Sequence, residues 1–150
     1  LKYKGPGVAT NFLDDKGNKS SIEADDGWFF PGDLAKKLPS DHIQLVGRSN
    51  DLIIRGGINI YPNEIESTLI NDPGIKEVSV IGHKNRDSGE TIVAFLETNS
   101  KFELKKCLDF CKKNLAPYKI PAKFIQLDYL PKKESGKIDK QQLKESLKKI

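Results

Sequence analysis

The stretch RGGINIYPNEIESTLINDPGIKEVSVIGH, residues 55–83, contains the change of hydrophobic period that decides the fold. Pro62 suits the first turn of a helix, because that turn leaves its N–H groups unbonded and proline has none. Ile65 and Leu69 then share one helix face, and the turn residues 71–74 end the helix. The segment KEVSVIGH that follows is typical of a β-strand. Helix and strand are therefore mixed within a short span.

The same mixing continues downstream. TIVAFLE, residues 91–97, and KFIQL, residues 123–127, are typical of two further strands. Between them, Ser100 and Glu103 have the spacing of a capping box, which predicts the start of a second helix. An Asp-x-x-Gln pattern beginning at Asp139 predicts a last helix. This order of elements indicates the α+β fold class.

The second predicted helix carries Cys107 and Cys111 four residues apart on an apolar face. We interpret them as core thiols in a reducing compartment rather than as a disulfide or a metal pair. His42 and His83 are the two histidines, and they assemble no ligand cluster, so no metal site is predicted in this chain.

Residues 1–47 contain short apolar runs broken by Gly, Pro, Asp and Asn, which predicts a β-rich unit. IQLV, residues 43–46, and DLII, residues 51–54, are strand candidates, and the short loop between them suits either paired strands or a domain seam. We expect the α+β domain to occupy residues 48–150. Because the chain begins at Leu1 and contains no methionine, we also expect it to be a piece of a longer protein.

Composition limits the functional classes. With 150 residues, 37% of them hydrophobic, the chain can bury one real core. No apolar run approaches the roughly 20 residues of a membrane span, and the N-terminal segment lacks a signal-peptide pattern, so a cytoplasmic location is expected. The net charge of +4 suits a phosphate-bearing partner, but the lysines do not alternate with aromatic residues. A nucleic-acid partner is therefore not predicted.

Lys137 lies in LPKKESGKIDK, residues 130–140, a lysine-rich stretch that is most simply a solvated loop. The stretch is no phosphate-binding P-loop, because Pro131 replaces the first glycine and Ile138 replaces the hydroxyl residue. What remains is a lysine beside a flexible Ser-Gly, which can bring a point charge to a phosphate or carboxylate oxygen. From the residues alone, a surface lysine is the simpler interpretation.

Asp33, in GWFFPGDL, can accept two hydrogen bonds from a vicinal diol such as ribose, or it can cap a turn. Gly56 and Gly57 can let a thin ligand approach bare backbone, or they can form a hairpin bend. Glu64 and Glu66 on the following helix are most simply solvated, and their place in its first turns favours negative charge.

Taken in order, GWFFPGDL, GRSNDLIIRGGINIYPNEIE, LAPYKIP and LPKKESGKI resemble the closing motifs of the adenylate-forming superfamily, which includes acyl-CoA synthetases, peptide synthetase adenylation domains and firefly luciferase. The resemblance covers essentially the whole chain. It implies that residues 1–47 are the tail of a large N-terminal domain. Residues 48–150 would form its small, mobile C-terminal lid, with a short sheet and packed helices in three layers. The phosphate loop and the acyl pocket would lie upstream, so this fragment alone is expected to be inactive.

The resemblance also implies roles for single residues. Asp33 matches the carboxylate that holds the ATP ribose, Arg48 matches the arginine that assists it, and Lys137 matches the catalytic lysine of adenylation. Asn50 matches the hinge of the lid, where Asp or Lys is usual. Gly56 and Gly57 would line the pantetheine tunnel in the second half-reaction.

The function that the resemblance implies is that of a carboxylate–CoA ligase, most like an acyl-CoA or fatty-acid–CoA ligase. Such an enzyme uses ATP, Mg²⁺ and CoA to form an acyl-adenylate and then a thioester. Its partners would be a carboxylic acid, ATP, CoA and the upstream N-terminal domain. The alternatives are a non-catalytic module that binds CoA or a carrier protein, and the lid of a peptide synthetase adenylation domain.

Overall fold

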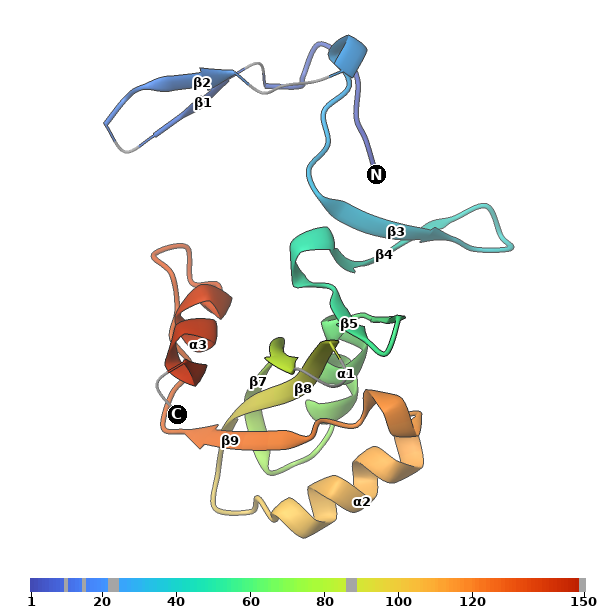
Figure 1. The fold of residues 1–150 in the computed structure, drawn as a ribbon, viewed down its shortest axis with the longest axis vertical. Helices are drawn as coiled ribbons and strands as arrows, with labels where there is room; N and C mark the ends of the chain where they lie inside the picture. Colours follow the sequence, from blue (N-terminus) through green and yellow to red (C-terminus); the bar gives the residue numbers. More distant parts are fainter. Residues whose placement is uncertain (10, 15, 22–24, 86–88, 149–150) are drawn as a thin grey trace. The chain divides into compact units, whose positions relative to one another are not determined.

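The structure is a computed structural model that describes residues 1–9, 11–14, 16–21, 25–85 and 89–148 of the chain. The chain divides into two compact units, Leu1–Asn50 and Asp51–Ile150, each described by itself (Figure 1). The boundary expected from the sequence lies between residues 47 and 48, whereas the units of the structure divide after Asn50.

The described residues of the first unit include two antiparallel ribbons and a short 3-10 helix, η1 (Asp25–Gly27). One ribbon pairs β1 (Asn11–Leu13) with β2 (Lys19–Ser21), and the other pairs β3 (Asp33–Lys37) with β4 (Ile43–Arg48). None of the side chains described in this unit is buried. Ile43 and Leu45, two residues apart on β4, are 62% and 61% exposed, so one face of this ribbon presents apolar surface.

The second unit contains a five-stranded mixed sheet. Its longest strands, β7 (Ile75–Asn85) and β8 (Gly89–Thr98), pair antiparallel, and β9 (Lys123–Leu127) pairs parallel to β8. The short strands β5 (Ile53–Arg55) and β6 (Ile58–Ile60) form a hairpin, which joins β8 through the pair Arg55 and Gly89. Three α-helices among the described residues accompany the sheet: α1 (Pro62–Leu69), α2 (Leu104–Asn114) and α3 (Lys140–Leu147).

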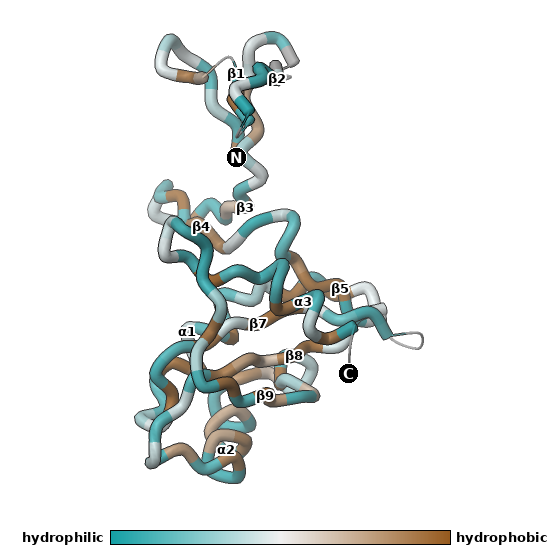
Figure 2. The backbone as a smooth tube through the Cα atoms, turned by 90° about the vertical axis from the view of Figure 1, so that its left-hand side faces the viewer, coloured by the Kyte–Doolittle hydropathy of each residue, from teal (hydrophilic) through white to brown (hydrophobic). Residues whose placement is uncertain are grey.

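Side chains alternate between the two faces of the sheet, and each face has its own core. On β8, Ile92, Ala94 and Leu96 belong to the cluster that contains residues of α1 and α2. Val93 and Phe95 between them belong to the cluster that contains Leu143 and Leu147 of α3. Helices therefore cover both faces, and Figure 2 shows the hydrophobic residues concentrated along β7 and β8. The predicted α+β fold class with three layers is confirmed.

The sequence signals that predicted where helices begin are confirmed for α1 and α3 and wrong for α2. Pro62 is the first residue of α1, and the Asp139 carboxylate caps α3 by accepting hydrogen bonds from the N–H groups of Gln141 and Gln142. The capping box predicted for α2 does not form. Glu103 is the N-cap residue, but its side chain makes no cap hydrogen bond and pairs with Lys106 instead.

The two strand candidates on either side of residue 50 do not pair with each other. The first is β4, which pairs with β3, and the second is β5, which pairs with β6 and β8. Residues Ser49–Asp51 between them form a 3-10 helix, η2. The sequence left open whether this loop joins paired strands or lies at a domain boundary, and the structure agrees with a boundary between two units.

Cys107 and Cys111 are free thiols, fully buried in the cluster with α1, so the prediction of core thiols is confirmed. A hydrogen bond with Cys111, together with burial, raises the pKa of Cys107 far above its ordinary value. This thiol therefore stays protonated, which makes it a poor nucleophile.

Gly74, in the turn before β7, is expected to tolerate no side chain. A Cβ atom there would lie 2.5 Å from the Cα atom of Phe102, which is backbone and cannot rotate away. Gly74→Ala should therefore lower the free energy of unfolding by about 1–3 kcal/mol, the usual cost of overpacking. Urea unfolding checks this, with Gly7→Ala as the control because nothing lies within 4 Å of a Cβ atom at Gly7. Equal stability of the two variants would contradict the close packing at Gly74.

Candidate functional site

Lys137 lies in a tight hairpin between β9 and α3. Lys132 and Ile138 form an antiparallel bridge at its base. The N–H of Lys133 donates to the carbonyl of Lys137 at 2.8 Å, and the N–H of Gly136 donates to the carbonyl of Lys133 at 2.8 Å. With a φ of 77° at Gly136, this is the pattern of a type I turn followed by a glycine bulge. The Ser-Gly pair expected to be flexible is thus part of a hydrogen-bonded turn.

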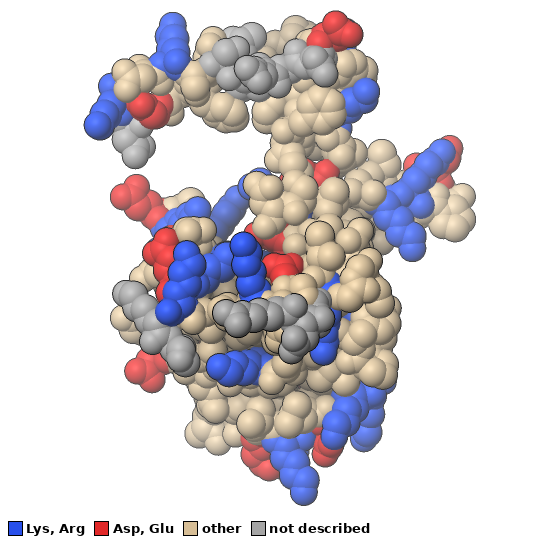
Figure 3. Space-filling view, viewed as in Figure 1, with Lys and Arg blue, Asp and Glu red and all other residues tan. Residues whose placement is uncertain are grey.

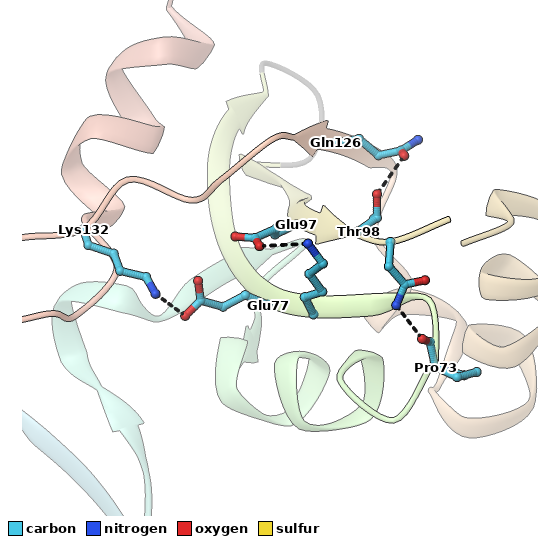
Figure 4. Close-up of polar contacts among 8 residues, drawn as sticks. Pro73, Glu77, Glu97, Thr98, Gln126 and Lys132 are labelled. Atoms are coloured by element: carbon cyan, nitrogen blue, oxygen red, sulfur yellow. Dashed lines mark hydrogen bonds and ion pairs between the residues drawn. The ribbon is translucent and has the colours of Figure 1, made fainter. Parts of the chain in front are cut away.

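The side chain of Lys137 is exposed, and its ammonium has no hydrogen bond or ion pair among the residues that the structure describes. The base of the hairpin is held more firmly. The N–H of Asp139 donates to the carbonyl of Pro131 at 2.7 Å, and Lys132 pairs with Glu77 of β7 at 3.0 Å. Figure 4 shows Lys132 and Glu77 pointing toward each other. The hairpin is therefore anchored at its base and presents a cation that has no partner in the described part of the chain.

Glu66 is not solvated, as the sequence had suggested, and that interpretation is wrong. Its side chain on α1 is only 20% exposed. Its Oε1 atom accepts a hydrogen bond from the N–H of Val80 at 2.7 Å and pairs with the ammonium of Lys140 at 2.9 Å. Sequence reasoning missed this contact because Lys140 lies 74 residues away along the chain. Glu64 is more exposed, at 46%, but it also pairs, with Lys119.

Gly56 and Gly57 form the bend between β5 and β6. Their φ angles are 55° and 79°, and positive values at both central residues are those of a type I′ hairpin turn. A Cβ atom at either position would meet nothing within 4 Å, so the backbone of the bend faces open space. Arg55 donates from Nη1 to the carbonyl of Tyr118 at 3.1 Å, which ties the bend to the 3-10 helix η3 (Pro117–Lys119). The two interpretations offered by the sequence are therefore compatible, because the hairpin bend at Gly56 and Gly57 also leaves bare backbone that a ligand could approach.

Asp33 and Arg48 meet within the first unit. They stand opposite each other where β3 pairs with β4, and Arg48 Nε lies 3.3 Å from Asp33 Oδ1. The N–H of Ser49 donates to the carbonyl of Gly32 at 2.8 Å, which closes this end of the ribbon. The carboxylate is 25% exposed and the guanidinium side chain 65% exposed. An accessible carboxylate with a cation beside it can accept hydrogen bonds from hydroxyl groups.

Asn50 is exposed in η2, as the last residue of the first unit.

In the described parts of the chain, no group of three or more His, Cys, Asp or Glu residues is arranged to hold a metal ion. No helix in the same parts is both long and apolar enough to cross a membrane. On the face of the second unit seen in Figure 3, lysines and arginines lie in several separate groups with acidic residues among them.

Comparison with known families and curated proteins gives one consistent result. Residues 64–137 match the model of the AMP-binding enzyme C-terminal domain. The 2-succinylbenzoate–CoA ligase of Bacillus subtilis is 38% identical over 149 residues, which are 99% of this chain and 30% of that ligase. The corresponding ligase of Listeria monocytogenes is 40% identical over 147 residues, 97% of this chain and 31% of that ligase. The chain thus spans about 30% of the length of these curated relatives.

Solved structures of CoA synthetases also match this chain. The o-succinylbenzoate CoA synthetase of Bacillus subtilis, in complex with its acyl-adenylate intermediate, matches with a TM-score of 0.85 and 37% identity over 95% of this chain and 29% of that chain. In complex with ATP and magnesium, the same synthetase matches with a TM-score of 0.80 and 35% identity over 98% of this chain and 30% of that chain. A Mycobacterium tuberculosis fatty acyl CoA synthetase matches with a TM-score of 0.68 and 36% identity over 82% of this chain and 25% of that chain.

Proposed function

Because this chain belongs to the AMP-binding enzymes through their C-terminal domain, we propose that it is the C-terminal part of an ATP-dependent carboxylate–CoA ligase. The whole protein would form an acyl-adenylate and then an acyl-CoA thioester. The observation that carries the proposal is the exposed ammonium of Lys137, which has no partner among the described residues and lies on an anchored hairpin. The chain around it aligns over 99% of its own length with the C-terminal 30% of a CoA ligase.

We assign Lys137 to the adenylation step. In this step a carboxylate attacks the α-phosphate of ATP and displaces pyrophosphate, so two anions must approach each other. A cation between them stabilises the charge that develops and holds the reacting groups together. An ammonium that has no partner among the described residues suits this role, because no ion pair with those residues has to break before it binds substrate.

We assign Asp33 and Arg48 to the ribose of ATP. The carboxylate of Asp33 can accept hydrogen bonds from both ribose hydroxyls, and Arg48 at 3.3 Å from its Oδ1 atom holds the carboxylate in place. Mg²⁺ would enter with ATP as part of the substrate complex, and we assign none of the described residues to it.

We assign the second half-reaction to the bend at Gly56 and Gly57 and to the hinge at Asn50. The open backbone of the bend allows a pantetheine arm to pass closely. The tail of the large N-terminal domain would end, and the mobile lid begin, near Asn50, where the two units divide. A rotation about this residue would exchange Lys137 for the glycine bend at one active site.

The upstream N-terminal domain would supply the acyl pocket. We place 2-succinylbenzoate first among candidate acids, because the ligases that align over nearly the whole chain are named for it. We also propose a cytoplasmic location, which two unpaired buried thiols favour.

The product of the full-length protein tests this proposal. The protein is incubated with ATP, Mg²⁺, CoA and one acid at a time: 2-succinylbenzoate, anthranilate or a fatty acid. We expect mass spectrometry to detect one class of acyl-CoA. An adenylate without a thioester would favour the peptide-synthetase alternative, and no product with any acid would favour a module that binds CoA or a carrier protein without chemistry.

A further inference from the structure

We propose that the ion pair between Glu66 and Lys140 positions Lys137 for adenylation. The inference rests on the proposed function of Lys137 and adds two residues that act through it without touching substrate. Glu66 lies on α1, and Lys140 is the first residue of α3, immediately after the hairpin that carries Lys137. The pair thus joins the end of the hairpin to a different part of the domain.

The contact unites three elements at one carboxylate oxygen. Glu66 Oε1 accepts from the ammonium of Lys140 at 2.9 Å and from the backbone N–H of Val80 on β7 at 2.7 Å. The Lys140 ammonium also lies 3.4 Å from the carbonyl of Val80. The start of α3 is therefore held against both α1 and the sheet by charge-assisted hydrogen bonds, which are stronger than neutral ones.

This pair is better shielded from solvent than the others. The side chains of Lys140 and Glu66 are 22% and 20% exposed. Every other ion pair found among the described residues has at least one side chain that is 46% exposed or more. Water and salt weaken exposed pairs, so this is the ion pair able to hold a fixed geometry, and removing one partner leaves a poorly solvated charge.

Because the chain between Lys140 and Lys137 is short and held in place, the position of Lys140 determines where Lys137 lies. Only Ile138 and Asp139 separate the two lysines, and both are fixed. Ile138 packs against the core cluster that contains Leu143 of α3, and the N–H of Asp139 donates to the carbonyl of Pro131. The second tether, between Lys132 and Glu77, is more exposed, so we assign it the smaller effect.

The test measures the two half-reactions separately in the full-length protein. Pyrophosphate release with ATP and the active acid reports adenylation, and thioester formation from supplied acyl-adenylate reports the step that does not use Lys137. Lys140→Met removes the charge and keeps the length of the side chain. We expect it to lower kcat for adenylation about 10- to 100-fold, the cost of a misplaced catalytic group, with a small change in KM for ATP and in the thioester step.

Three further variants separate a positioning role from a general effect on folding. Lys140→Arg keeps the charge and should restore most of the adenylation rate. Glu66→Gln keeps an acceptor for the Val80 N–H but removes the charge, and it should reproduce the loss seen with Lys140→Met. Lys148→Met makes the same change at an exposed position of the same segment and should have no effect.

Equal losses in both half-reactions, or full adenylation in Lys140→Met and Glu66→Gln, would overturn the positioning role. Failure of the proposed function gives a different result. In that case the wild-type protein releases no pyrophosphate with any acid, or Lys137→Ala adenylates as fast as wild type, and the positioning role falls with it.

Discussion

Lys137→Ala in the full-length protein is expected to slow acyl-adenylate formation by roughly 10²- to 10³-fold or more, the effect of removing one preorganised electrostatic contact from a transition state. Thioester formation from supplied acyl-adenylate should change little, because no second anion then approaches the α-phosphate. The exposed side chain makes no hydrogen bond or ion pair within the described part of the chain, so the substitution should leave the hairpin and its backbone hydrogen bonds intact.

Lys133→Ala is the matched control for this prediction. Lys133 lies on the same hairpin and is exposed, and its backbone N–H bonds to the carbonyl of Lys137. Removing the side chain of Lys133 also removes one positive charge from the hairpin, and it leaves the backbone hydrogen bond to Lys137 in place. If both alanine variants slow adenylation equally, the effect comes from the overall positive charge of the hairpin, and the specific role of Lys137 is wrong.

Gly57→Asn is expected to impair the thioester step selectively. Asparagine tolerates the positive φ of 79° at this position, and its Cβ atom would meet nothing within 4 Å of the folded chain. Its side chain would instead occupy space that the pantetheine arm needs. An overlap costing about 1–3 kcal/mol corresponds to roughly a 5- to 160-fold slower reaction with CoA, while adenylation stays near the wild-type rate.

Gly17→Asn provides the control for the backbone change, because Gly17 also has a positive φ, of 78°, and open space around its Cβ position. Stopped-flow measurement of thioester formation at several CoA concentrations compares the two variants. Unchanged CoA kinetics in Gly57→Asn would remove the bend from the CoA path. Slower adenylation in the same variant would point to a folding defect.

Features of the fold that depend on near neighbours in the sequence could be predicted. Pro62 begins α1, and Asp139 caps α3, because each signal acts within one helical turn. The four-residue spacing of Cys107 and Cys111 likewise predicted their common buried face. The capping box failed because α2 begins at Leu104 with Glu103 as its N-cap residue, so Ser100 lies outside the helix and cannot cap it.

The site could be predicted only in part. Asp33 and Lys137 each had a simpler interpretation when taken alone, and the order of four motifs was needed to single them out together with Arg48. The structure adds what local patterns do not carry: the pairing of Asp33 with Arg48 across a ribbon, and the ordered turn before Lys137. The Glu66–Lys140 contact joins residues 74 apart, so only the three-dimensional fold reveals it.

Pyrophosphate release by the full-length wild-type protein, measured with ATP and Mg²⁺ in the presence and absence of each carboxylic acid, tests the central claim most directly. A CoA-independent release that requires one class of acid is the result we predict, because adenylation precedes the thioester step. A folded protein that binds CoA but releases no pyrophosphate with any acid would contradict the ligase and favour the binding module.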